Sequence, residues 1–303
     1  MGSRRLTIGF SLIYMSLNKN SQGAYSGGKV SIVNNLVVIS FFLKRKSNGH
    51  SRGRKSKKSA IPTEEGMRLS FQKTRKKVAN IIKCNVWQWF RKNGKPYSPI
   101  FLTLTFRDPV TDITIANRYF SEFFQNYNYR LFKKKDKILQ YIAVPEFQKN
   151  GRVHFHVLIF NLPFNKRNHK IAEEVWKHGM INMKVMQARS SKNLSSYLTK
   201  YMLKNSNDLK MYNKRKYFCS LNVLKPIELN SYFLANSILT SLKKTKYSSE
   251  IERIDIECPF VGIIKYYTCK LDKFESILDL ELDSYTKNRL ESEINKENGK
   301  RLI

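Results

Sequence analysis

The chain has 303 residues, 41% of them apolar, which is enough for one or two globular domains with a sizeable core. Its 56 Lys and Arg residues against 23 Asp and Glu residues give a formal net charge of +33 at pH 7. This excess goes beyond what solubility requires and predicts a polyanionic partner. The four cysteines are widely spaced and form no CxxC pair, which favours free thiols in a reducing cytoplasm and argues against a disulfide framework.

Residues 1–62 are expected to form a basic, partly disordered N-terminal arm with a strand at 30–43. That apolar run is too short to cross a bilayer, so no membrane partner is expected. The cations of the arm are expected to bind DNA by counterion release, although a solvated basic linker would have the same composition. The residues expected to contact DNA are Lys44, Arg45, Lys46, Arg52, Arg54, Lys55, Lys57, Lys58 and, beside a later strand, Arg152.

Residues 63–210 carry the clearest secondary-structure signals. A helix is expected over 63–91, and then strands and helices alternate. The expected order is a strand at 99–106, a helix at 115–132, strands at 138–144 and 153–160 joined by a hairpin, a helix at 171–177, a strand at 180–185 and a helix at 191–204. This βαββαβ order followed by a helix predicts an α+β fold in which helices cover an antiparallel sheet. Residues 211–303 are interpreted as a C-terminal accessory region of mixed character, with a polar helical tail from about residue 273.

The stretch GRVHFHVLIF places His154 and His156 two residues apart in a strand, so both imidazoles project from one face while Phe155 projects from the other. Two imidazoles that point at one small volume can bind a divalent metal. The alternative is two unrelated histidines on a polar face of the sheet, and an HxH pair by itself is a weak indication of a metal site.

The third metal ligand depends on the register of the hairpin. A three-residue loop at 149–151 sets Glu146 opposite His154, whereas a two-residue turn sets it opposite the next residue. The first arrangement completes a Glu-His-His site. Pro145 predicts a bulge that could re-aim the carboxylate, and Gln148 is a weaker substitute on the same face.

The stretch SSYLTKYMLK places Tyr197 and Tyr201 one turn apart on one helix face, and Lys200 and Lys204 each follow a tyrosine by three residues. A phenol has a pKa of about 10, so nucleophilic attack on phosphorus requires a nearby cation or metal that favours the phenolate. Such an attack would leave a covalent 5′-phosphotyrosine that preserves the bond for rejoining. The alternative is an ordinary apolar stripe at helical spacing, in which both rings are core residues.

These motifs together resemble the HUH superfamily of rolling-circle replication initiators, over residues 99–205. FLTLTF at 101–106 is similar to the first motif of that family, HFH at 154–156 to its histidine motif, and YLTKYMLK at 197–204 to its tyrosine motif. The two-tyrosine form resembles the branch that includes the phage A proteins and related plasmid initiators. The resemblance implies a five-stranded ferredoxin-like sheet.

The resemblance also implies roles for individual residues. His154, His156 and an acidic third ligand, here Glu146, would hold Mg²⁺ or Mn²⁺, and Tyr197 and Tyr201 would alternate in nicking and strand transfer. The implied partners are single-stranded DNA at a replication origin and a host helicase and polymerase, with no small-molecule cofactor. The N-terminal arm and the C-terminal region match no motif, and the chain contains no Walker A sequence, so a helicase within this chain is not expected.

Two other functions remain open from the sequence. A relaxase or transposase would use the same motifs on a different DNA substrate. A noncatalytic DNA- or RNA-binding protein would stack bases on an exposed sheet and form no covalent adduct. A structural zinc site is disfavoured, because only two histidines converge and no cysteine lies near them.

Overall fold

The structure is a computed structural model that describes residues 27–43, 64–187, 191–204, 211, 214–258, 262–272 and 276–299, together with the backbone of residues 4–6. The described residues between 59 and 225 form one compact unit, and those of 1–58 and 226–297 form a second. The expected DNA contacts of the basic arm, at 44–58, lie outside the described residues. Within the described part of the chain, no helix combines the length and the apolar character needed to cross a bilayer.

The first unit contains the predicted βαββαβ order followed by a helix. Its elements are α1 (Glu64–Asn85), β4 (Ile100–Phe106), α2 (Ile113–Phe132), β5 (Tyr141–Phe147), β6 (Val153–Ile159), α3 (Lys166–Val175), β7 (Gly179–Val185), α4 (Ser191–Lys204) and β8 (Phe218–Cys219). The strands form one sheet in the order β7-β4-β6-β5-β8, with every neighbouring pair antiparallel. The first four strands have the ferredoxin-like arrangement, so the predicted α+β class is confirmed.

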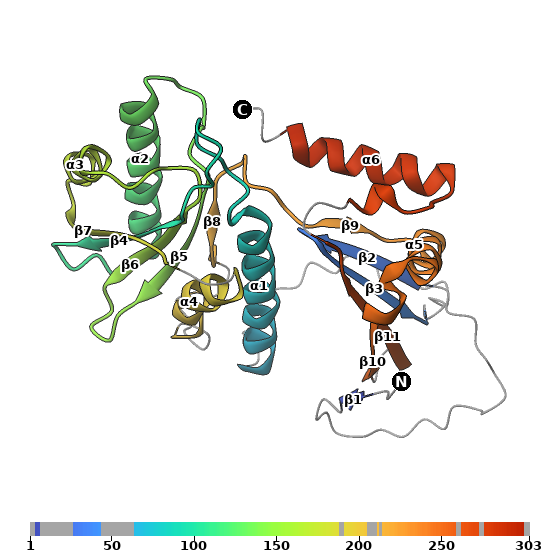
Figure 1. Cartoon of the computed structure of the whole chain (residues 1–303). Helices are drawn as coiled ribbons and strands as arrows, with labels where there is room; N and C mark the ends of the chain where they lie inside the picture. Colours follow the sequence, from blue (N-terminus) through green and yellow to red (C-terminus); the bar gives the residue numbers. More distant parts are fainter. Residues whose placement is uncertain are drawn as a thin grey trace. The chain divides into compact units, whose positions relative to one another are not determined.

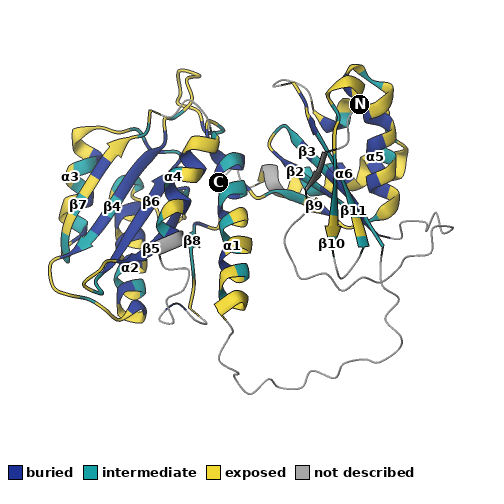
Figure 2. Ribbon diagram, turned by 90° about the horizontal axis from the view of Figure 1, so that it is seen from below, coloured by how far each residue is buried: buried dark blue, intermediate teal, exposed yellow. Residues whose placement is uncertain are grey.

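Helices cover both faces of this sheet. Figure 1 shows α2 and α3 on one side and α4, with α1 packed beside it, on the other. Because side chains alternate along a strand, one set of strand residues packs under α2 and α3 and the other set faces α4. The core under α2 and α3 includes Ile100, Leu102, Leu104, Phe120, Phe123, Phe124, Phe155, Val157 and Trp176. Figure 2 shows the central strands β4 and β6 as buried, whereas the helices that cover the sheet have exposed outer sides.

Phe155 anchors this core from the strand that carries the two histidines. Its side chain is fully buried, with ring centroids 4.5 Å from Phe120 and 6.0 Å from Phe218. Phe155→Ala is therefore expected to lower the free energy of unfolding by about 3–5 kcal/mol, measured by urea denaturation. Phe164→Ala is the control, because that ring is 44% exposed and its loss should cost no more than about 0.5 kcal/mol. Equal effects of the two variants would contradict this account of the core.

The hairpin between β5 and β6 has the three-residue loop that the sequence offered as one of two registers. The amide of Gln148 donates to the carbonyl of Arg152 (2.9 Å), and Gly151, with φ 81°, donates to the carbonyl of Gln148 (2.8 Å). Glycine suits this left-handed position because it has no Cβ. The loop sets Glu146 opposite His154.

The expected bulge at Pro145 is wrong, since the pairing of β5 with β6 runs without interruption from Tyr141 to Phe147. On the outer side of β5, β8 pairs only with Ile142 and Ala143. Pro145 lies beyond this paired stretch, so its missing amide proton interrupts no hydrogen bond between β5 and β8. The strand also starts three residues later than predicted. The side-chain amide oxygens of Asn128 and Asn161 accept from the backbone amides of residues 138–140, which keeps these residues out of the ladder.

The leading helix ends at Asn85, six residues before the predicted end at Arg91. The side chain of Asn85 is fully buried and donates to the carbonyls of Ile81 and Leu224 (2.8 Å each). The amide of Leu224 donates back to Asn85 (2.9 Å). This pairing with a residue 139 positions away fixes the helix end, and the chain then reverses at Trp87, which has φ 59°.

The second unit draws its strands from both ends of the chain. Its described elements are β1 (Arg4–Leu6), β2 (Gly27–Val33), β3 (Leu36–Phe42), β9 (Ile227–Leu229), α5 (Tyr232–Lys244), η2 (Lys246–Glu250), β10 (Glu252–Cys258), β11 (Gly262–Lys270), η3 (Ile277–Asp279) and α6 (Ser284–Asn298). The sheet order is β1-β10-β11-β3-β2-β9, and α5 packs against β2 and β3. Residues 1–62 and 211–303 are predicted to be separate regions, whereas described strands from both segments share this sheet.

The expected strand at 30–43 is instead a hairpin of β2 and β3. The turn lies at Asn34 and Asn35, and Asn34 adopts φ 59°, a conformation that asparagine tolerates. β9 and β11 pair with the two outer sides of this hairpin. At Gly28 a Cβ would approach the Cα of Tyr232 to 2.7 Å, so glycine allows α5 to pack close to β2. A hairpin alone buries too little surface to be stable, and its pairing on both sides stabilises it.

Candidate active site

His154 and His156 project from β6 toward α4. Both side chains are buried, with exposed fractions of 8% and 5%. Thr105 of β4 lies opposite His154, and Thr103 lies opposite His156 with its hydroxyl 3.3 Å from Nδ1. The two imidazoles therefore lie in one partly polar layer between the sheet and α4.

Glu146 joins the same layer from β5. It is 5% exposed, it pairs with His154 in the ladder, and its carboxylate contacts Nε2 of His156. The side-chain amide of Gln148 lies 3.3 Å from Nδ1 of His154. The structure thus brings together Glu146, His154 and His156, the three residues predicted as metal ligands. Gln148, the weaker candidate for the third ligand, lies beside them.

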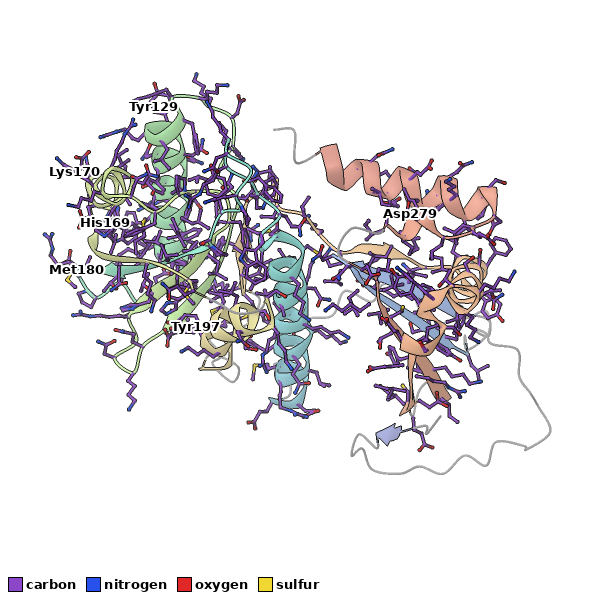
Figure 3. All side chains as sticks on the ribbon, in the orientation of Figure 1. Tyr129, His169, Lys170, Met180, Tyr197 and Asp279 are labelled. Atoms are coloured by element: carbon purple, nitrogen blue, oxygen red, sulfur yellow. The ribbon has the colours of Figure 1, made fainter. Side chains whose placement is uncertain are left out.

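The two tyrosines of α4 lie against this layer, and Figure 3 labels Tyr197 on that helix. The ring of Tyr201 stacks on His156 with centroids 3.6 Å apart and planes inclined by 20°. Tyr197 packs edge-on against Phe101 at 4.9 Å and lies 5.8 Å from Tyr201. Both tyrosines are half-buried, whereas the apolar residues of the same helix, Leu194, Leu198 and Met202, are 2% exposed or less. The apolar stripe is therefore made by these residues, and the tyrosines border it.

Two lysines lie beside the phenol of Tyr197. Nζ of Lys200 lies 4.2 Å from the ring centroid of Tyr197 and 5.0 Å from that of Tyr201. Nζ of Lys184, on β7, donates to the hydroxyl of Tyr197 at 3.4 Å. The side chain of Lys204 lies outside the described residues. These cations surround a position where a phosphate of a nucleic acid could bind.

The surroundings shift the pKa values of the two tyrosines in opposite directions. Burial acts to raise the pKa of Tyr197, but hydrogen bonds with Tyr201 and Lys184 and the charges of Lys184 and Lys200 bring it below its usual value of 10.0. Burial raises the pKa of Tyr201, and so do its hydrogen bond with Tyr197 and the negative charge of Glu146. The phenolate thus forms more readily on Tyr197.

Lys184→Met tests this electrostatic arrangement. Removal of the cation should raise the pKa of Tyr197, so any reaction that needs its phenolate should reach its maximal rate at a higher pH. Each unit of this shift should lower the rate about tenfold at pH values below the pKa. The measurement is a pH–rate profile, with Lys170→Met, an exposed lysine of α3, as the control. Identical profiles for Lys184→Met and the parent protein would contradict the prediction.

Comparison with known proteins agrees with the motifs. Residues 99–206 match the model of the family described as Replication-associated protein ORF2/G2P. This segment is therefore similar to replication-associated proteins of that family. The chain is also 31% identical over 171 residues to the Phasyl DNA replicon protein arp of Escherichia coli. The aligned region covers 48% of this chain and 58% of that protein. The chain thus spans little more than half the length of this curated relative, and no solved structure was found to match it.

The family match and the replicon relative both support the resemblance to replication initiators that the motifs predicted. The matched range includes all six clustered residues, Glu146, His154, His156, Tyr197, Lys200 and Tyr201. Arg152 is half-buried in the β5–β6 hairpin, and its carbonyl accepts from the amide of Gln148.

Sequence reasoning missed three contributors to this site. Phe101 supports both tyrosines, and Lys184 contacts Tyr197. Arg75 of α1 donates to the hydroxyl of Thr199 at 3.4 Å and links α1 to the tyrosine helix. The alternation along 99–106 could have placed Phe101 on the histidine face, because it is an even number of residues from Thr103 and Thr105.

The side chains of Glu146, His154 and His156 suit a divalent metal, since imidazole nitrogens and carboxylate oxygens bind Mn²⁺ and Mg²⁺. Among the residues that the structure describes, however, no three His, Cys, Asp or Glu side chains are arranged as a ready metal site. Glu146 and His156 instead contact each other directly. Metal binding would have to replace the proton in that contact, as is usual for imidazole ligands.

Proposed function

We propose that this protein is a replication initiator that nicks single-stranded DNA through a tyrosine nucleophile. The observation that carries the proposal is the packing of the tyrosine helix on the buried layer of Glu146, His154 and His156. The ring centroids of Tyr201 and His156 are 3.6 Å apart. The ORF2/G2P match and the similarity to a replicon protein support the role in replication. The net charge of +33 suits a nucleic acid substrate.

Tyr197 is the proposed first nucleophile. Its phenolate oxygen attacks the phosphorus of the scissile phosphodiester, and the bond from phosphorus to the 3′ oxygen breaks. The products are a tyrosine ester of the 5′ phosphate and a free 3′-hydroxyl, which takes up the proton that Tyr197 lost. Lys184 and Lys200 stabilise the phenolate before attack and lie where they can bind the phosphate oxygens. Attack of a 3′-hydroxyl on the ester reverses the reaction and rejoins the strand.

Glu146, His154 and His156 are the proposed ligands of a divalent ion. When bound, Mg²⁺ or Mn²⁺ would supply Lewis-acid polarisation of the scissile phosphate. Thr103 and Gln148 would hold the two imidazoles in fixed orientations, since each contacts one Nδ1.

Tyr201 is the proposed second nucleophile. While Tyr197 is free, Tyr201 stays protonated and donates to it, which is consistent with the raised pKa of Tyr201. Once Tyr197 carries a phosphate, the two rings are close enough for the helix to present a second phenol to the same site. Two nucleophiles allow one strand to be cut while another is still attached.

In this proposal the substrate is single-stranded DNA at an origin of a phage or plasmid in the host cytoplasm, and the free 3′-hydroxyl primes a host polymerase assisted by a host helicase. A relaxase or transposase would use the same chemistry on a different DNA. The noncatalytic alternative requires an open sheet face for base stacking. It has less support, because helices pack on both faces of the five-stranded sheet.

The deciding experiment looks for a covalent intermediate. The full chain is incubated with labelled single-stranded DNA that contains candidate origin hairpins, with Mn²⁺ or with EDTA. We expect a protein–DNA adduct that resists denaturant, forms only with metal and disappears when Tyr197 and Tyr201 are both Phe. Tyr129→Phe is the control, since that ring is 51% exposed on α2 (Figure 3). Binding of many sequences without any adduct would favour the noncatalytic function.

A further inference from the structure

A short segment between α1 and β4, residues 86–97, combines exposed aromatic rings with cations. Phe90 is 60% exposed and Trp87 is 37% exposed. Arg91, Lys92 and Lys95 are all exposed. The stretch from residue 66 to residue 107 contains ten Lys and Arg residues and no Asp or Glu. The segment therefore offers stacking surfaces and positive charge without a competing carboxylate of its own.

The backbone at Trp87 is unusual for a tryptophan. With φ 59° it occupies the left-handed position that follows many helices, which glycine usually fills. A residue with a Cβ is strained in this conformation, because the Cβ crowds the neighbouring carbonyl oxygen. Burial in a core does not explain why a tryptophan occupies this position, because Trp87 is 37% exposed. Trp89 and Trp176 are only 8% and 2% exposed. A strained and exposed aromatic residue indicates a function for the side chain.

The segment is also held in a defined shape. Phe90 and Pro96 form a β-bridge, and the amide of Arg91 donates to the carbonyl of Lys95 (2.9 Å). The amide of Gly94 donates to the carbonyl of Arg91 (2.9 Å), which closes a tight turn at the tip. A Cβ added at Gly94 would meet nothing within 4 Å, so the tip extends into open space. The guanidinium of Arg91 lies 5.5 Å from the ring centroid of Tyr97.

From these features we infer that residues 86–97, the basic hairpin, form a second contact for single-stranded DNA. Bases stack on Trp87 and Phe90, and Arg91, Lys92 and Lys95 bind the phosphates. The hairpin contributes none of the residues proposed for nicking, so this binding does not depend on cleavage. Stacking needs unpaired bases, and the hairpin therefore selects single strands over duplex DNA without reading a sequence.

The intrinsic fluorescence of the protein can report this contact. Trp87 is the most exposed of the three tryptophans, so a base stacked on it should quench the emission. The full chain with Tyr197→Phe and Tyr201→Phe is titrated with oligothymidylate, which lacks any origin sequence and cannot be cleaved by this variant. We expect quenching that saturates, that is lost in Trp87→Phe and that is weak with duplex DNA of equal length. Equal quenching in Trp87→Phe, or no quenching despite binding, would overturn the assignment.

Affinity measurements in the same background separate stacking from charge. Phe90→Ala should weaken oligothymidylate binding about tenfold without unfolding the protein, because the ring is exposed. Ala at Arg91, Lys92 and Lys95 should reduce the slope of log affinity against log salt by about two. Ala at Lys134, Lys135 and Lys170, exposed cations of the α2 and α3 layer, removes the same charge and is the control. Equal slopes for the two triple variants would overturn the proposal.

These measurements remain informative if the proposed nicking fails. A protein that forms no adduct but shows Trp87-dependent quenching would keep the hairpin contact and lose the nuclease. A protein that forms the adduct normally while all hairpin variants bind like the parent would keep the nuclease and lose the hairpin contact.

Discussion

Tyr197→Phe is expected to lower the rate of the first strand cleavage by about 10⁴-fold or more, which is the usual scale for loss of a nucleophile. The structure distinguishes the two tyrosines by their surroundings. Tyr197 has a lowered pKa beside Lys184 and Lys200, whereas Tyr201 has a raised pKa and stacks on His156. Tyr201→Phe should therefore slow the first cleavage by only about tenfold, through loss of a hydrogen bond that favours the Tyr197 phenolate.

The measurement is a single-turnover assay of the adduct, with peptide mapping of the attached tyrosine. Tyr201→Phe should still give an adduct on Tyr197 but fail in a second transfer that needs a free phenol while the first is occupied. The opposite result, with Tyr197→Phe active and Tyr201→Phe inactive in the first cleavage, would show that the order of the nucleophiles is reversed. Tyr129→Phe should leave both steps unchanged.

His156→Ala is expected to weaken Mn²⁺ binding more than about 100-fold, since even residues that only orient metal ligands contribute 10–100-fold. Glu146→Gln should act in the same direction, because it keeps the volume of the side chain and removes the charge that a cation requires. Binding is measured by calorimetry on the full chain with Tyr197→Phe and Tyr201→Phe, so that no DNA chemistry contributes.

The matched control for this prediction is His169→Ala, a histidine of α3 that lies beside Glu173. It should bind Mn²⁺ like the parent protein. Circular dichroism checks that the buried substitution at His156 has not unfolded the protein. A folded His156→Ala variant with unchanged Mn²⁺ affinity would remove this residue from the metal site and leave the chemistry to the tyrosines and lysines alone.

Local pattern predicted much of the first unit. The βαββαβ order follows from short-range periodicity and turn residues, and α4 was predicted with its observed ends at Ser191 and Lys204. The register of Glu146 against His154 could be reduced to two choices, because a hairpin loop allows only a few lengths. These features depend on residues that are close in the sequence.

Features that depend on distant residues could not be predicted in this way. The apolar pattern of α1 continues past Asn85, and only the contact with Leu224 ends the helix there. Lys184 reaches Tyr197 because β7 pairs with β4, a neighbour that the sequence does not specify. The pairing of β3 with β11 likewise joins segments separated by the whole first unit. Each of these is a long-range contact, whose partner is not encoded in the local pattern.

The shared sheet of the second unit has a consequence for synthesis on the ribosome. The hairpin of β2 and β3 is made early, but its two pairing partners, β9 and β11, follow only after the entire first unit. At about 5–20 residues per second, the hairpin waits roughly ten seconds or more with both of its outer sides unpaired. A chain that stops after β8 would keep those sides open permanently. Such a product should retain its nicking residues yet be prone to aggregate through exposed strand edges.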